Sequence, residues 1–176
     1  KIDAFNHILP KPFFDRFQEV TENKGSVKRW LTIPFLHDID TRFQMLEEFG
    51  EEYRQVLSLS SPPLEAINPD QQITLDMCTL ANDSMADLVD RHPERFPGFL
   101  ASLAMNYPDE AVRELERAVG ELGALGVQIF SNVNGRPLDD ARYFGVFEAA
   151  DRLGIPVFLH PARGAGRPDY EGESKS

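Results

Sequence analysis

Short apolar runs alternate with segments of helical periodicity along the 176 residues, and this alternation constrains the fold more than any other feature. The apolar runs predict strands at 1–7, 55–60, 99–103, 126–131 and 155–160. The periodic segments predict helices at 38–49, 71–91, 109–122 and 139–153. Strands and helices in alternation favour a parallel sheet with its helices outside. The continuously apolar run IPVFLH at 155–160 is typical of a strand buried on both faces.

Two architectures are compatible with such a sheet. One is a doubly wound open sheet, and the other is the first five units of an eight-fold β/α barrel. A complete barrel needs roughly 250 residues, which is more than this chain has. No internal boundary is visible, so residues 1–176 are treated as one domain.

Charge and composition exclude several classes of function. The net charge is −11, whereas a nucleic-acid binder needs clustered Lys and Arg for its phosphate contacts. No apolar run approaches the roughly 18 residues of a membrane span. The single Cys78 cannot form an internal disulfide. We therefore expect a soluble, cytoplasmic protein without a nucleic-acid or membrane partner.

Two of the four histidines stand where predicted strands end. Ligands of parallel α/β folds bind at the carboxyl ends of the strands, and His7 and His160 end the first and fifth strands. Two imidazoles converging there would form half of a metal site; capping or hydrogen-bonding roles are the alternative. Asn134, after the fourth strand, and Arg163, in the loop after the fifth, are candidate substrate contacts.

Two further stretches carry specific expectations. Residues 8–37 form an unusually long connection rich in aromatic residues, which we interpret as an inserted lid or as an oligomer contact. In the helix at 109–122, the pairing of Glu110 and Glu114 with Arg113 and Arg117 predicts a solvated face. Phe144 and Phe147 are expected to be buried by the helix at 139–153.

Several motifs, in order along nearly the whole chain, resemble one enzyme family. They are KIDAFNHILP at 1–10, Asn-Asp at 82–83, PERF at 93–96, the helix at 111–121, GVQI at 126–129, Val-Asn at 133–134 and FLHP at 158–161. This pattern is similar to that of the amidohydrolase-related enzymes, the family typified by 2-amino-3-carboxymuconate-6-semialdehyde decarboxylase.

The resemblance implies a (β/α)8 barrel of the metal-dependent hydrolase type, of which this chain holds about the first five βα units. It implies one divalent metal, usually zinc, with His7 and His160 as ligands beside a late aspartate. It places the acid–base histidine on the sixth strand, beyond residue 176, and makes Arg29 a substrate-binding arginine. Many relatives are dimers, so a homodimer is expected.

The sequence departs from the family pattern in two ways. Phe5 stands where the first ligand histidine is expected, and a phenyl ring has no lone pair to offer a metal. The chain also stops after the fifth strand, so we expect it to be the N-terminal part of a longer protein. The leading expectation is a decarboxylase of a small aromatic or unsaturated carboxylic acid. A hydrolase, lactonase or hydratase, with or without metal, and a non-catalytic barrel that lost its metal are the alternatives.

Overall fold

The five predicted strands form one parallel sheet. The computed structural model describes residues 1–22 and 24–162. The strands are β1 (Ile2–Ile8), β2 (Arg54–Leu59), β3 (Gly98–Ser102), β4 (Gly126–Phe130) and β7 (Val157–His160). They pair in the order β1-β2-β3-β4-β7, and every neighbouring pair is parallel. The predicted parallel α/β arrangement is therefore confirmed.

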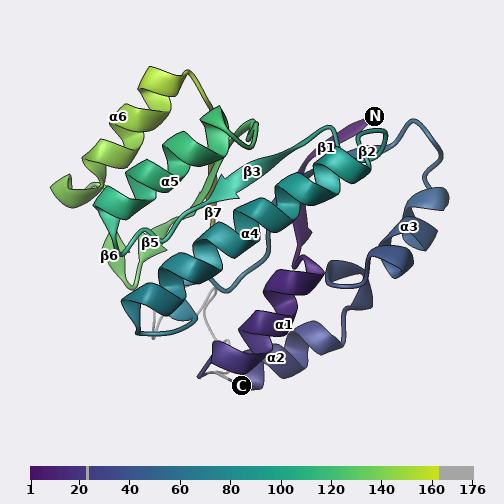
Figure 1. Cartoon of the computed structure of the whole chain (residues 1–176), viewed down its shortest axis with the longest axis horizontal. Helices are drawn as coiled ribbons and strands as arrows, with labels where there is room; N and C mark the ends of the chain where they lie inside the picture. Colours follow the sequence, from purple (N-terminus) through teal and green to yellow (C-terminus); the bar gives the residue numbers. More distant parts are fainter. Residues whose placement is uncertain (23, 163–176) are drawn as a thin grey trace, which may run out of the picture.

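The helices cover the outside of the sheet. They are α3 (Ile39–Glu47), α4 (Gln71–Arg91), α5 (Pro108–Gly120) and α6 (Phe144–Leu153). The long α4 runs between the α5–α6 pair and a group formed by α3 and two earlier helices, α1 (Lys11–Val20) and α2 (Lys24–Leu31) (Figure 1). Asp70 caps α4 by accepting from the Ile73 amide, and Gly154 ends α6 at a φ of +66°. None of the described helices combines the length and apolarity needed to cross a membrane.

One apolar side chain was assigned to the wrong environment, and one helix ends two residues earlier than predicted. Phe144 was expected in the core, but it is 52% exposed. The turn before it, η3 (Ala141–Tyr143), is a 3-10 helix, which has fewer residues per turn than an α-helix. The face that points to the core is therefore shifted along the sequence, and Tyr143 and Val146 are buried instead. Phe49 was placed in the helix at 38–49, yet α3 ends at Glu47 and Phe49 is exposed.

Residues 8–37 are more regular than expected. They contain α1 (Lys11–Val20), α2 (Lys24–Leu31) and η1 (Pro34–Leu36), and α1 packs against α4. Phe13, Phe14, Phe17 and Trp30 are buried in the core. Because buried rings cannot contact a second molecule, these four give no support to an oligomer contact. The role of the segment as a lid stays a prediction.

The sheet is strongly curled, as contacts between its two edge strands show. In a flat sheet β1 and β7 would lie four strand spacings apart, roughly 19 Å. Yet Phe5 of β1 stacks on Phe158 of β7 with ring centroids 5.8 Å apart and an interplanar angle of 11°. The carboxyl ends of the first and last strands therefore share one concave inner face.

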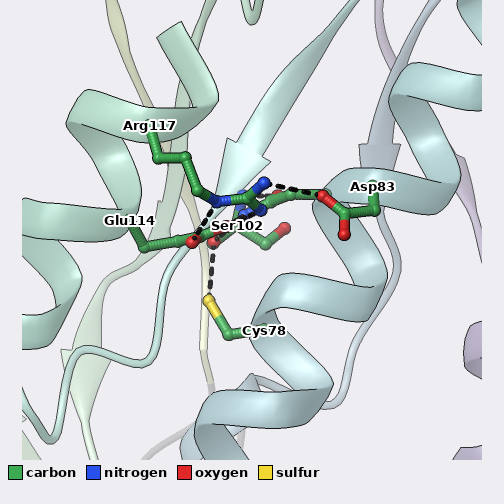
Figure 2. A network of polar contacts seen from close by, with 6 residues as sticks. Cys78, Asp83, Ser102, Glu114 and Arg117 are labelled. Atoms are coloured by element: carbon green, nitrogen blue, oxygen red, sulfur yellow. Dashed lines mark hydrogen bonds and ion pairs between the residues drawn. The ribbon is translucent and has the colours of Figure 1, made fainter. Parts of the chain in front are cut away.

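A polar network fastens α4 to β3 and α5 on the outside of this sheet (Figure 2). Asn82 of α4 accepts from the Ser102 amide at 2.8 Å and donates to the Ser102 carbonyl at 3.0 Å. Arg117 pairs with both Asp83 and Glu114 at 2.8 Å. The expectation of a solvated face was wrong for Glu114 and Arg117, because these charges face α4 rather than solvent.

Candidate functional site

His7 and His160 come together at the carboxyl ends of β1 and β7. Their ring centroids are 5.0 Å apart, and the ring planes are inclined by 47°. Register explains this: His7 pairs with Ser58 on β2, and His160 pairs with Phe130 on β4. Alternation along each strand then directs both imidazoles to the concave face. The two residues predicted as a half-site are neighbours in space.

Hydrogen-bond counting fixes the tautomer of His7. The Ser58 hydroxyl donates its only proton to the Asn6 carbonyl at 2.9 Å. The same hydroxyl lies 2.9 Å from His7 Nδ1, so in this contact it must accept from Nδ1–H. Neutral His7 therefore carries its proton on Nδ1 and keeps the lone pair on Nε2.

His160 also directs Nδ1 at an oxygen acceptor. Its Nδ1 lies 2.8 Å from the Pro161 carbonyl oxygen. A carbonyl accepts and never donates, so Nδ1 is again the protonated nitrogen. A histidine that donates Nδ1–H to an oxygen and leaves Nε2 free has the arrangement typical of a metal ligand.

The electrostatics of His7 favour the neutral ring that a metal requires. Burial lowers the pKa of His7 below its usual value, and the neighbouring His160 lowers it further. Asp3 acts in the opposite direction. A neutral imidazole at physiological pH can offer its lone pair to a divalent cation.

Phe5 occupies the inner face directly beside both histidines. Its ring contacts His7 edge-on, with centroids 4.9 Å apart, and lies 5.8 Å from His160. Two nitrogen donors are therefore present, and an apolar wall stands beside them. Within residues 1–22 and 24–162, no group of three or more His, Cys, Asp or Glu is arranged to hold a metal ion. The donor set fits two positions of a metal site.

A cavity of about 350 Å³ opens at the same edge of the sheet. Its lining includes His160, Phe130, Asn132 and Asn134. The two asparagines belong to a hairpin that the sequence reading missed, made of β5 (Asn132–Val133) and β6 (Arg136–Pro137). Asn134 and Gly135 form its tip, with φ values of +50° and +83°, and Asn-Gly is the sequence signal that could have revealed the turn.

The polar groups of this hairpin differ in how far they are already engaged. Asn132 donates to the Ala162 carbonyl and accepts from the Gly135 amide. Asn134 is exposed and makes only a long 3.5 Å contact from Nδ2 to the Glu65 carbonyl. Of the two amides, Asn134 is the freer to meet a ligand, and its role as a substrate contact stays a prediction.

A buried arginine that sequence reading missed holds the end of β1. Arg42 of α3 is 1% exposed and donates to Asn6 Oδ1 at 2.5 Å, Gln55 Oε1 at 2.6 Å and the Phe35 and His7 carbonyls. Burial lowers its pKa to about 10, so the guanidinium stays charged at neutral pH. No sequence signal marks an arginine as buried, because most are solvated.

The two predicted substrate-binding arginines are not tested by this geometry. Arg29 belongs to α2, but its side chain lies outside the described residues. Arg163 lies wholly outside them. Both therefore stay predictions.

Comparison with known proteins gives a consistent family. Residues 40–175 match the family model described as amidohydrolase. The chain is 32% identical to 2-amino-3-carboxymuconate-6-semialdehyde decarboxylase of Dictyostelium discoideum, over 97% of this chain and 52% of that protein. It is 40% identical to gamma-resorcylate decarboxylase of a Polaromonas species, over 69% of this chain and 38% of that protein. The chain thus spans about half, or less, of these curated relatives.

A solved structure extends the likeness to three dimensions. The fold matches 5-carboxyvanillate decarboxylase of Novosphingobium aromaticivorans, solved with manganese and 3-methoxy-4-hydroxy-5-nitrobenzoic acid, with a TM-score of 0.79. The sequences are 26% identical, and the match covers 93% of this chain and 51% of that one. The curled sheet thus corresponds to part of the barrel of these enzymes, as the resemblance implied.

Proposed function

Because this chain belongs to the amidohydrolase family, we propose that the full-length protein is a metal-dependent, non-oxidative decarboxylase of a small aromatic carboxylic acid. The observation that carries the proposal is the pair of imidazoles of His7 and His160, whose ring centroids lie 5.0 Å apart at the shared mouth of β1 and β7 and whose Nδ1 atoms each contact an oxygen. Similarity to decarboxylases of aromatic and unsaturated acids supports the reaction and the substrate class.

His7 and His160 are proposed as two of the ligands of a divalent metal. A neighbouring structure contains manganese, and imidazole ligands also suit zinc. When bound, the metal would polarise the substrate carboxylate and an adjacent oxygen. The remaining ligand, the late aspartate that the family resemblance implies, is proposed to follow residue 176.

The residues of this chain have separable roles in substrate binding. The rings of Phe5, Phe158 and Phe130 form an apolar wall beside the histidines, which suits a flat aromatic ring and excludes water from it. Asn134 at the hairpin tip is placed to hydrogen-bond a polar substituent. Arg29 and Arg163 are proposed to bind the substrate carboxylate.

Metal content and turnover test this function together. We expect about one equivalent of manganese or zinc in the purified full-length protein, release of CO2 from hydroxybenzoic acids, and loss of both in a His160→Ala variant. Glu121→Gln, at an exposed carboxylate far from the mouth, is the control and should keep both. Hydrolysis or hydration without CO2 release would favour the alternative chemistries of the family.

A different result would point to a non-catalytic protein. Phe5 stands where a nitrogen donor is expected, so metal binding and catalysis could have been lost while the barrel fold was kept. A folded full-length protein without metal or turnover would show this. A Phe5→His variant separates these cases. If it gains metal and activity, the proposed site is correctly placed but inactive in the natural protein.

A further inference from the structure

Strand β1 contains one residue more than its pairing with β2 requires. Asp3 pairs with Gln55 of β2, and Asn6 pairs with Leu57, so three steps along β1 correspond to two steps along β2. Such an extra residue is a β-bulge, and bulges are frequent beside active sites, where they redirect a side chain. This bulge lies immediately before His7, one of the two residues proposed to bind the metal.

The bulge decides which face of the sheet His7 occupies. Residues that pair across parallel strands point to the same face, and successive residues of a strand alternate between the two faces. His7 pairs with Ser58, whose hydroxyl contacts the imidazole. Without the extra residue, the register at Asp3 would pair His7 with Leu59 instead. Because Ser58 and Leu59 are successive, the imidazole would then point to the outer face, which the helices cover.

The side chains around the bulge show this change of face. Asn6 Nδ2 donates to Asp3 Oδ2 at 2.9 Å, a contact between positions three apart in the chain. On a regular strand, two such positions lie on opposite faces. Phe5 and His7 lie together on the concave face, with ring centroids 4.9 Å apart. The bulge therefore places Asp3 and Asn6 on the outer face and leaves the inner face to the two rings.

Asp3, Asn6 and Arg42 hold the bulge in place. Phe5 has no paired residue on β2, and its amide donates instead to Asp3 Oδ1 at 3.3 Å. Asn6 links Asp3 to Arg42 of α3, because its Oδ1 accepts from the guanidinium at 2.5 Å. Arg42 also donates to the His7 carbonyl, directly after the bulge. A slip of β1 into regular register would break these bonds.

The position of Arg42 suits control of the register. Arg42 is 1% exposed, and burial of a guanidinium is costly unless its donors are used. Three of its acceptors flank the bulge: Asn6 and His7 follow it on β1, and Gln55 lies opposite its start on β2. A planar group that donates to both strands at once fixes one strand relative to the other.

We propose that the bulge in β1 positions a metal ligand, and that Asp3, Asn6 and Arg42 are positioning residues that keep the imidazole of His7 on the concave face. The three residues act through His7 and do not contact the metal or the substrate themselves. This inference rests on the proposed function, because a bound metal is what gives the orientation of the ring its catalytic meaning. The network acts by holding β1 one residue out of regular register.

Nitrogen NMR of the metal-free full-length protein tests the positioning without any activity. In the natural protein we expect His7 to give the signals of a ring that donates its Nδ1 proton to Ser58. Asn6→Ala removes the link between Asp3 and Arg42 and should weaken or split these signals, because β1 then also populates the regular register. Asn82→Ala is the matched control: it removes a buried amide from the network between α4 and β3 and should leave the signals of His7 unchanged. Unchanged signals in Asn6→Ala would overturn the inference.

Manganese titration of the same metal-free proteins tests the consequence for the site. Asn6→Ala should bind manganese at least about tenfold more weakly than the natural protein. Asn82→Ala should keep the natural affinity, even where urea unfolding shows an equal loss of stability. Tyr53→Phe is the milder variant, because it removes only the 3.0 Å bond to the Asp3 carboxylate. It should fold and show a smaller loss of affinity, and it carries both measurements if Asn6→Ala does not fold.

The outcomes separate this inference from the proposed function. If the natural protein binds manganese and both variants bind it equally well, the positioning role is overturned while the metal site stands. If the natural protein binds no metal, the proposed function fails. The ring signals of His7 then decide on their own whether the bulge network positions this side chain.

Discussion

Single hydroxyl, carboxyl and guanidinium groups decide the state of the site. Ser58 fixes the proton of His7 on Nδ1, and burial raises the pKa of Glu65 to about 7. Neither residue could be identified from the sequence. A serine in a strand and a glutamate after a proline pair are ordinary in the sequence, and only the tertiary contacts give them a role.

Ser58→Ala should weaken metal binding without disturbing the fold. Without the hydroxyl, His7 loses the acceptor for Nδ1–H, and its ring can change tautomer and orientation. Loss of such a supporting contact typically costs about 10–100-fold in metal affinity, measured by titration of the metal-free full-length protein. Ser84→Ala, at a buried serine of α4, is the matched control. Equal affinities in the two variants would contradict the tautomer assignment.

Glu65 should make stability depend on pH. Its folded pKa of about 7 lies above its ordinary value of 4.5, so the folded protein retains a proton that the unfolded chain releases. Raising the pH through this window therefore destabilises the fold by up to about 3 kcal/mol. Urea unfolding at pH 5 and pH 8 should show this loss in the natural protein and a smaller one in Glu65→Gln. The same loss in both would contradict burial of the charge.

At the scale of elements, the apolar runs and the helical spacing of apolar residues predicted the five strands and the longer helices. All five strands were predicted, but only β2, β3 and β4 are mostly buried. The expectation that the run at 155–160 is buried on both faces was wrong, because β7 lies at the edge of the sheet and Val157 and Leu159 are 38% and 57% exposed. The β5–β6 hairpin and the helices α1 and α2 were missed, since turn residues and prolines obscured short elements. Phe144 was misplaced because periodicity alone does not reveal a change of phase between a 3-10 turn and the following helix.

Arg42 connects α3 to the end of β1 and should not tolerate replacement. Arg42→Lys keeps the charge, but an ammonium cannot reach the separate acceptors that the planar guanidinium contacts. We expect a loss of at least about 2 kcal/mol in the free energy of unfolding. Denaturant titration measures it, and Arg91→Lys, at an exposed ion pair of α4, should cost little. A loss no larger than that of the control would contradict the clamp.

At the scale of the whole molecule, the site depends on curvature. His7 and His160 meet because four strand pairings in succession bend the sheet until its edges face each other. The sequence predicted that the two residues stand at strand ends. It did not predict their 5.0 Å separation, because curvature emerges from packing across all the strands. The homodimer stays a prediction, which light scattering of the full-length protein can check.

Gly126→Ala should damage the site from a distance. A Cβ at Gly126 would lie 2.8 Å from the Pro156 carbonyl oxygen, so β4 and β7 must shift apart. We expect lower metal affinity and a loss of about 1–3 kcal/mol in stability. Gly120→Ala is the control, because a Cβ at this helical position meets nothing within 4 Å. It should be neutral or stabilising. Unchanged metal affinity in Gly126→Ala would contradict the dependence on curvature.

The bond from Cys78 Sγ to the Ser102 carbonyl gives the molecule a natural reporter. Cys78 is the single cysteine of this sequence and is 2% exposed, and burial raises the pKa of its thiol. A maleimide can therefore react only when α4 lifts away from β3. The labelling rate of this chain would time that breathing motion directly, and Asn82→Ala should accelerate it.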